Sequence, residues 1–305
     1  MDSRPHPSVM EQVALPLLAR LQRLLAEGAR PVLAINGPVG AGKTSLTQEL
    51  QALALAAGLR LGVASIDDFY LPWPERQQAM AGNPFGVTRV PPGSHDLPLL
   101  LQSLRAWRGG GLFRWPRFDK ALRQGQGDRQ GLREAPFDAL VLEGWLLGCR
   151  SLNLTASSAG STWRRSLDAA TPSLTAEEIA WLPRWDAELQ RYHPVWELLD
   201  GIWVLRPSDW RWPRRWRFQA EARQRRRARH GGDPAGWLAP HELEALVRAS
   251  LCSLPPVLYQ DALITGSAGI TGSAGRVMAV ATLDSRRRCL GCRTQSSDSS
   301  SLSMG

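Results

Sequence analysis

A glycine-rich segment early in the chain has the spacing of a phosphate-binding loop. Residues 37–44 read GPVGAGKT and match the pattern GxxxxGK[ST] at every fixed position. Such a loop turns tightly and directs backbone N–H groups at phosphate oxygens, and the start of the following helix adds positive potential. Lys43 would reach the β- and γ-phosphates of ATP, and the Thr44 hydroxyl would bind Mg²⁺. The expected nucleotide-binding residues are Gly37, Pro38, Val39, Gly40, Ala41, Gly42, Lys43, Thr44 and Ser45.

Acidic residues follow two predicted strands. Asp67 and Asp68 come at the end of the apolar run 61–66, and Glu143 follows the run 139–142. A carboxylate at a strand end beside the phosphate loop can assist Mg²⁺ or its water shell, which we expect of Glu143. A kinase that acts on an alcohol also gains from a carboxylate that accepts the hydroxyl proton. Adjacent side chains point in different directions, so one aspartate is expected to face the reacting groups, and the other to cap a helix or lie in the outer shell of Mg²⁺.

Lysine is rare in this chain, because only two of the 37 basic residues are lysines, Lys43 and Lys120. A coding bias towards arginine explains the excess of arginine. The two exceptions indicate positions where a compact ammonium fits and a planar, forked guanidinium does not. Lys120 ends the segment PRFDK, just upstream of GDR at 127–129. We therefore expect Lys120, like Lys43, to take part in the chemistry.

Several segments, in this order along the chain, resemble one family. They are the glycine loop, SIDDFY (65–70), RVPPGSHDL (89–97), PRFDK (116–120), GDR (127–129) and EGW (143–145), followed by LQRYHPVW (189–196) and WRFQAE (216–221). This set resembles the plant- and cyanobacterial-type D-glycerate 3-kinases, in the P-loop kinase group that also contains phosphoribulokinase, uridine kinase and pantothenate kinase. The similarity runs from about residue 31 to residue 259. It implies transfer of the ATP γ-phosphate to D-glycerate, giving 3-phosphoglycerate, with ATP and Mg²⁺ as cofactors and a link to photorespiration.

The resemblance also implies roles for single residues. Asp67 is implied as the base, because related kinases keep an acid at this position and vary the next one. His95 and Asp96 are placed near the substrate hydroxyls. Arg217 is the best-matched residue of an arginine-rich lid, and Arg214 and Arg223 are weaker matches. The expected catalytic residues are Lys43, Asp67, Lys120 and Arg217.

The chemistry of glycerate adds a requirement of its own. The molecule carries one carboxylate, so its pocket needs a cation at one end. Arg89, Lys120 and Arg129 are the candidates, Arg129 through a bidentate contact with the carboxylate. An exposed surface charge is the alternative for most of the arginines. The expected substrate-binding residues are Arg89, His95, Asp96, Lys120 and Arg129.

The periodicity of apolar residues predicts alternating strands and helices. Expected strands cover 31–36, 61–66, 139–142, 202–205 and 277–283, and expected helices cover 9–27, 43–57, 97–107, 209–230 and 241–251. Residues 72–93 and 109–136 are rich in glycine, proline or polar residues and are expected to be irregular. The predicted fold class is α/β, a three-layer αβα P-loop NTPase fold with a mainly parallel sheet and an arginine-rich helical lid.

We expect one kinase domain over residues 1–285. It would contain a surface insertion at 151–176 and a flexible segment at 264–276, where the hexapeptide ITGSAG occurs twice in tandem. Residues 286–305 end in a serine-rich run and are expected to be disordered. Removal of the chain after Leu283 is therefore expected to leave turnover nearly intact.

Composition restricts the partners and the compartment. The 305-residue chain has a net charge of +9 and a pI near 10.3, which admits nucleic acid, an anionic membrane surface or small phosphorylated ligands. We expect no nucleic-acid partner, since the arginines are dispersed and no zinc-finger or single-strand-binding motif accompanies them. The sequence has no apolar run of membrane-spanning length and no signal peptide, so a cytoplasmic location is expected. Four scattered cysteines predict no disulfide framework, and the CxxC at 289–292 has no second pair for zinc.

Two alternatives remain open from the sequence. Another kinase of the same group, acting on a nucleoside, pantothenate or a sugar phosphate, would share the loop and the strand-end acids. A basic P-loop ATPase or nucleic-acid-binding protein would share the loop and the high pI.

Overall fold

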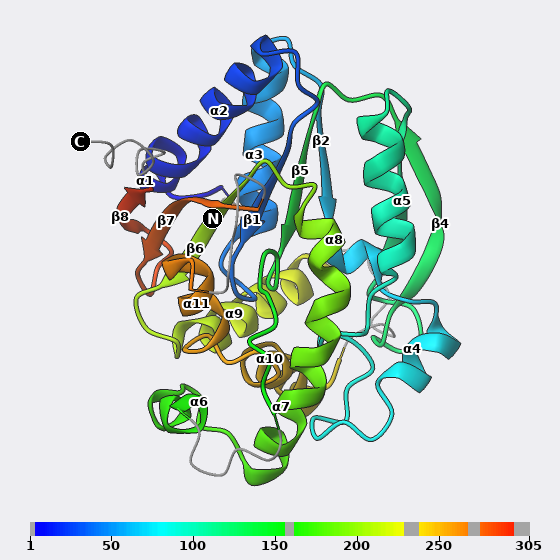
Figure 1. Ribbon diagram of the computed structural model, residues 1–305, viewed down its shortest axis with the longest axis vertical. Coiled ribbons are helices and arrows are strands. Elements are labelled where there is room, and N and C mark those ends of the chain that lie inside the picture. Colours follow the sequence, from blue (N-terminus) through cyan, green and yellow to red (C-terminus); the bar gives the residue numbers. More distant parts are fainter. Residues whose placement is uncertain (1–3, 156–161, 229–237, 268–274, 296–305) are drawn as a thin grey trace, which may run out of the picture.

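The computed structural model describes residues 4–155, 162–228, 238–267 and 275–295. A six-stranded sheet lies at its centre, with helices on both faces (Figure 1). The strands are β1 (Val32–Asn36), β2 (Leu61–Ser65), β5 (Ala139–Gly144), β6 (Gly201–Pro207), β7 (Val277–Leu283) and β8 (Cys289–Thr294). They follow the order β2-β5-β1-β6-β7-β8, and β8 alone runs antiparallel to its neighbour. The predicted three-layer α/β fold with a mainly parallel sheet is confirmed.

Both faces of the sheet are buried, as expected for parallel strands. In β1, Val32 and Ala34 belong to one core cluster, whereas Leu33 and Ile35 belong to the other. The first cluster is completed by α5 (Leu97–Arg108), α7 (Ala176–Leu189), α8 (His193–Trp196) and α11 (Tyr259–Thr265). The second is completed by α1 (Pro7–Val9), the π-helical segment η1 (Met10–Ala14), α2 (Leu15–Ala26) and α3 (Lys43–Ala56).

Residues 109–136 form a hairpin rather than the irregular stretch expected from the sequence. Strand β3 (Phe113–Asp119) pairs antiparallel with β4 (Asp128–Ala135), away from the main sheet. The expectation was wrong because β3 contains Pro116, β4 is largely exposed, and neither strand has a clean alternation of apolar and polar residues. A second predicted loop, 72–93, contains the short helix α4 (Trp73–Ala79).

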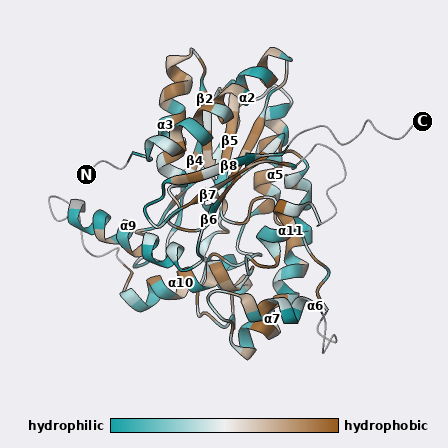
Figure 2. Cartoon of the chain, turned by 90° about the vertical axis from the view of Figure 1, so that its left-hand side faces the viewer, coloured by the Kyte–Doolittle hydropathy of each residue, from teal (hydrophilic) through white to brown (hydrophobic). Residues whose placement is uncertain are grey.

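The predicted lid is the helix α9 (Trp212–Ala228), and α10 (Pro240–Cys252) contacts it. Figure 2 shows α9 as a largely hydrophilic helix at one side of the molecule. The predicted end of this helix, at 229–230, lies outside the described residues, as do the central parts of the predicted insertion and of the tandem repeat. The remaining short elements are η2 (Ile66–Phe69), α6 (Thr162–Ser166), η3 (Leu167–Ala169) and η4 (Gln190–Tyr192). In the described ranges no helix is both long and apolar enough to span a bilayer.

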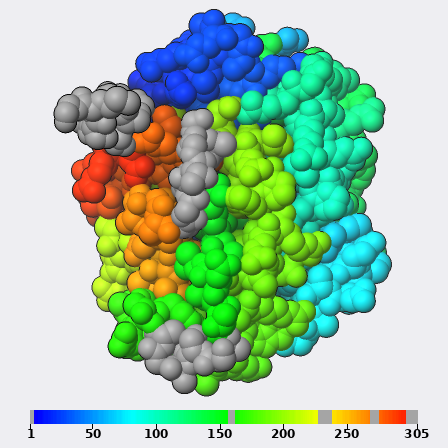
Figure 3. All heavy atoms as spheres, viewed as in Figure 1, coloured from blue at the N-terminus to red at the C-terminus, as the bar shows by residue number. Residues whose placement is uncertain are grey.

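The segment after residue 286 is ordered where the structure describes it, contrary to our expectation. Strand β8 pairs with β7, and its first residue is fastened to the start of the chain. The backbone N–H of Cys289 donates to the Ser8 hydroxyl at 2.9 Å, and its thiol lies 3.4 Å from Gln12 Oε1. Figure 3 shows the orange and red residues of this part of the chain below the blue amino-terminal residues. Sequence patterning missed β8 because it is an edge strand with mostly exposed side chains; residues 296–305 lie outside the described part.

This strand leads to a first prediction. A chain ending at Leu283 should lose at least about 2 kcal/mol of unfolding free energy, because several ladder hydrogen bonds worth roughly 1 kcal/mol each are removed and β7 becomes an open edge. A chain ending at Gln295, which keeps every described residue, is the control and should match the full-length protein. Urea unfolding measures both. Equal stability of the two truncations would contradict a structural role for β8.

Candidate active site

The phosphate loop connects β1 to α3. Gly40 and Gly42 adopt φ values of 75° and 93°, which residues with a side chain rarely adopt, and Gly42 precedes Lys43, the first residue of α3. The Lys43 ammonium donates to the carbonyls of Gly37 at 2.8 Å and Pro38 at 3.2 Å, so it lies over its own loop. Burial lowers the pKa of Lys43, an effect that the nearby carboxylates of Glu143 and Asp67 oppose.

Glu143 is the next-to-last residue of β5 and lies beside this loop. One carboxylate oxygen accepts from the Thr44 hydroxyl at 3.3 Å, and the other lies 3.9 Å from the Lys43 ammonium. A hydroxyl and a carboxylate next to a phosphate cradle are hard oxygen donors of the kind that Mg²⁺ takes together with phosphates and water. The described residues contain no cluster of three or more acidic, histidine or cysteine side chains that would hold a metal by itself. Thr44 and Glu143 therefore fit a Mg²⁺ ion that is bound together with a nucleotide.

Asp67 and Lys120 meet at the end of β2. Lys120 follows the last residue of β3, and its ammonium lies 2.8 Å from Asp67 Oδ2, while the Tyr70 hydroxyl donates to Oδ1 at 3.0 Å. Burial acts to raise the pKa of Asp67, but the charge and hydrogen bond of Lys120 outweigh it and hold that pKa well below its ordinary value. Asp67 is thus an ionised carboxylate close to Lys43, and both lysines of the chain lie at this one site.

Asp68 forms its hydrogen bonds with the protein backbone. Its carboxylate accepts the backbone N–H of Ser65 at 3.2 Å, in a capping box at the start of η2, and the N–H of Phe118 at 3.3 Å. These bonds fasten the end of β2 to β3. The adjacent acids therefore have separate surroundings, and Asp68 is the one that caps a helical turn.

His95 is a buried, neutral histidine near the Asp67 carboxylate. Its Nδ1 lies 2.7 Å from the Tyr192 hydroxyl, its ring stacks on Tyr70 with centroids 4.6 Å apart, and Nε2 is buried without a hydrogen-bond partner. Burial lowers the pKa of His95 to about 4. The Tyr192 hydroxyl also accepts the Gly93 N–H at 3.1 Å. Donation of its single proton to Nδ1 would leave the histidine proton on Nε2, where an oxygen of a bound molecule can accept it.

Asp96 and Arg129 form an ion pair with each other, so their charged groups already have a partner within the protein. Asp96 caps α5 by accepting the Leu99 N–H at 3.0 Å, and its second oxygen lies 2.9 Å from Arg129 Nη2. Arg129 Nε donates to the Tyr70 carbonyl at 2.6 Å. A Cβ on Gly127 would lie 2.3 Å from the Phe118 ring, which explains the glycine in the GDR segment. Asp96 and Arg129 therefore hold the start of α5 and the segment around Tyr70 in place.

Two buried arginines line the same region, and sequence analysis identified only one of them. Arg89 donates to the Gln126 carbonyl and lies near the Phe118 ring, and burial lowers its pKa. Arg76 of α4 is fully buried, donates to the carbonyls of Leu71 and Gly127, and has Nε without a partner. Neither forms an ion pair with a carboxylate of the described chain. No sequence pattern distinguishes Arg76 from the many exposed arginines.

The lid arginines separate into inward and outward residues. Arg217 Nη2 lies 3.2 Å from the buried Glu221 and is close enough to Arg89 to help lower its pKa. Arg214 pairs with Glu244 of α10 at 2.8 Å, and Arg223 is exposed, with Nε on the carbonyl of Gln219. Of the three, Arg217 alone lies at the charged cluster.

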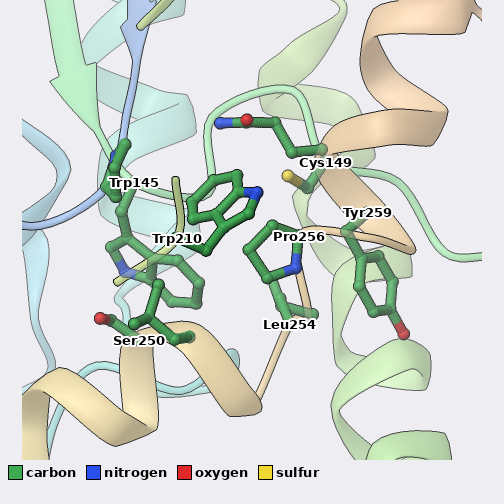
Figure 4. A pocket seen from close by; sticks show the side chains of 10 residues that line it. Trp145, Cys149, Trp210, Ser250, Leu254, Pro256 and Tyr259 are labelled. Atoms are coloured by element: carbon green, nitrogen blue, oxygen red, sulfur yellow. The ribbon is translucent and has the colours of Figure 1, made fainter. Parts of the chain in front are cut away.

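A hollow lined by uncharged side chains lies next to the phosphate loop. Figure 4 shows Trp145, Trp210, Leu254 and Pro256 around it, and Pro38 of the phosphate loop also lines it. No charged side chain lines the hollow.

Comparison with known proteins shows which proteins this chain resembles. The chain is 29% identical over 213 residues to the chloroplastic D-glycerate 3-kinase of Arabidopsis thaliana. It is 27% identical over 228 residues to the uncharacterized kinase mug58 of Schizosaccharomyces pombe, a match that covers 70% of this chain and 78% of the relative. The solved structure of D-glycerate 3-kinase from Cryptococcus neoformans superposes with a TM-score of 0.74 at 24% identity, over 94% of this chain and 99% of that chain. The chain is similar in sequence to a plant D-glycerate 3-kinase, and it shares the fold of P-loop kinases.

The similarity to the plant D-glycerate 3-kinase covers only part of each chain. The match covers 66% of this chain but only 43% of the plant protein, so the chain spans less than half of that relative. No protein-family model matches the chain. The fold, by contrast, agrees over nearly all of both chains in the fungal D-glycerate 3-kinase.

The buried histidine of this D-glycerate 3-kinase-like site leads to a prediction about pH. His95 has a pKa of about 4 in the folded chain, against 6.5 ordinarily, so below pH 6.5 the unfolded chain binds a proton that the folded chain does not. The unfolding free energy should therefore fall as the pH is lowered, by roughly 2 kcal/mol between pH 6.5 and 5. Urea titrations at several pH values measure this slope.

Two variants test the assignment. His95→Asn should flatten the slope over this interval, whereas His241→Asn, at an exposed position of α10, should keep it. A slope that survives in His95→Asn would show that another group causes the acid sensitivity.

Proposed function

We propose that the chain transfers the γ-phosphoryl group of ATP to D-glycerate and produces 3-phosphoglycerate. The observation that carries the proposal is the joint position of Asp67, Lys120 and Lys43, which brings a hydroxyl-activating carboxylate to the phosphate loop. The resemblance of the motifs and the likeness to D-glycerate 3-kinases support the choice of acceptor and of its hydroxyl.

The nucleotide end of the site follows from the loop. The backbone N–H groups of residues 37–44 would hold the phosphates, and Lys43 would leave its loop carbonyls for the β- and γ-phosphates. Thr44 and Glu143 would hold Mg²⁺, which supplies positive charge against the charge that develops in the transfer. Arg217, at the start of the lid, would contact the transferring group.

Asp67 is proposed as the acceptor of the hydroxyl proton. The hydroxyl oxygen of glycerate would attack the γ-phosphorus, the bond to the bridging oxygen would break, and its electron pair would leave on ADP. The ion pair with Lys120 keeps Asp67 ionised but makes it a weak base. An anionic acceptor that draws the ammonium towards itself would raise the basicity of Asp67 once the substrate is bound.

The carboxylate of glycerate would meet a cation with spare hydrogen-bonding capacity. Arg129 is held by Asp96 and Tyr70, which favours a supporting role for both Asp96 and Arg129. Arg89 makes one hydrogen bond to a carbonyl and no ion pair with any described carboxylate, and Lys120 is 56% exposed. We therefore assign the carboxylate to Arg89 and Lys120, and a substrate hydroxyl to His95 Nε2.

Product identification tests the function. Purified protein with Mg-ATP should release ADP in the presence of D-glycerate but not of uridine, pantothenate or ribulose 5-phosphate, and NMR should show 3-phosphoglycerate. A Lys43→Ala variant is the control for contaminating kinases. Formation of 2-phosphoglycerate, or ADP release that no acceptor stimulates, would overturn the assignment.

The two adjacent aspartates give a matched pair of variants. Asp67→Asn should lower kcat by roughly 10²–10⁴ while ATP still binds, because the proton acceptor is lost. A loose transition state would place the effect at the lower end, since the proton leaves late. Asp68→Asn should lower kcat less and stability more, because one oxygen cannot accept both the Ser65 and Phe118 N–H groups as the carboxylate does. Equal losses of kcat, or a greater loss in Asp68→Asn, would show that the base was assigned to the wrong residue.

A further inference from the structure

The turn between β7 and β8 lies against the phosphate loop. Arg287 Nε donates to the Gly40 carbonyl at 2.6 Å, and its Nη2 donates to the Trp216 carbonyl at 3.0 Å. The Trp216 indole N–H donates in return to the Ser285 carbonyl at 2.8 Å. One guanidinium thus joins a carbonyl of the phosphate loop to a carbonyl of α9, the helix that carries Arg217.

The turn is built in a way that aims Arg287 inward. The Asp284 carboxylate accepts the backbone N–H groups of Arg286 at 2.8 Å and Arg288 at 2.9 Å, which closes the turn. Arg287 itself adopts a φ of 64°, in the left-handed region that residues with a side chain rarely occupy. Its neighbours Arg286 and Arg288 remain exposed, whereas Arg287 is partly buried. Three consecutive arginines therefore have different surroundings, and only the middle one reaches the loop.

The start of α9 is in close contact with the loop at the same point. A Cβ on Gly40 would lie 2.7 Å from both the Arg217 nitrogen and the Trp216 Cβ, so only glycine fits there. Burial lowers the pKa of Arg287 to about 10, which leaves it charged at neutral pH. In the described part of the chain its donors go to these backbone carbonyls and not to a carboxylate. The guanidinium is thus placed between two backbone segments.

We propose that Arg287 is a positioning residue, which holds the Gly40–Ala41 peptide and the first turns of α9 in the arrangement that binds the nucleotide phosphates. In a planar trans peptide, fixing the Gly40 carbonyl also fixes the direction of the Ala41 N–H. The flanking glycines would otherwise let this peptide rotate, and that freedom would be lost on binding. Arg217 follows Trp216 directly, so the same anchor sets its distance from the loop. The inference rests on the nucleotide site of the proposed function, and not on the identity of the acceptor.

Nucleotide binding in the absence of any acceptor tests the inference. Isothermal titration with Mg-ATP should show an affinity on the order of tenfold weaker in Arg287→Ala than in the wild type, since two charge-assisted hydrogen bonds are lost. Arg286→Ala is the matched control, because it removes an exposed arginine from the same turn, and it should bind as the wild type does. Melting temperatures of the three proteins, measured in parallel, separate a loss of binding from a loss of folding.

The outcomes decide the role of Arg287. Wild-type affinity in Arg287→Ala, or a lowered melting temperature with unchanged affinity, would overturn the inference and leave Arg287 a structural residue only. If Arg287→Ala does not fold, Arg287→Lys decides, because one ammonium cannot span both carbonyls: weakened binding would support the inference, and wild-type binding would overturn it. A wrong acceptor would leave these results unchanged. Failure of the wild type to bind Mg-ATP would overturn the nucleotide site itself, and the inference with it.

Discussion

The parallel pairing of β5 with both of its neighbours determines where the chemistry of this chain lies. Glu143 is opposite Ile35 in the ladder with β1 and opposite Ser65 in the ladder with β2. The phosphate loop and Asp67 therefore leave the sheet at the same level as Glu143. Because side chains alternate between the faces of a strand, a slip of one residue in either ladder would direct these groups to opposite faces. The relative positions of these groups are therefore set by the register of the strands, and the single contacts of the site require that register.

The arginines and the lysines near the carboxyl ends of these strands bind different kinds of groups. Arg76, Arg89 and Arg287 each donate to backbone carbonyls, a task that suits a wide, planar donor with fixed directions. The two lysines occupy places where a single point charge meets a carboxylate or the oxygens of the loop. These three arginines thus have a structural use, in that their guanidinium groups hold irregular segments together.

The strongly patterned parts of the chain could be predicted from sequence, and the weakly patterned parts could not. Buried strands such as 139–142 and the glycine loop are recognisable because their residues face apolar cores or require left-handed backbone. In the β3–β4 hairpin, β4 is largely exposed and β3 contains a proline, so neither strand carries a clean periodic signal. Arg76 and Arg287 differ from exposed arginines only in what folds around them, and this information resides in tertiary contacts. The hydrogen bond from Phe118 to Asp68 likewise depends on the position of β3.

The contact between Arg287 and Gly40 can form only late in the synthesis of the segment that joins them, because the two residues are far apart in the sequence. The two residues are separated by 247 positions, and Ser8 is separated from its partner Cys289 by 281. At elongation rates of about 5–20 residues per second, the phosphate loop would wait roughly 12–50 s on the ribosome before the arginine that anchors it is made. During that interval the loop and the first helical segment must persist without their final neighbours. Until Arg287 has been made, any nucleotide that reaches the loop meets it in its unanchored form.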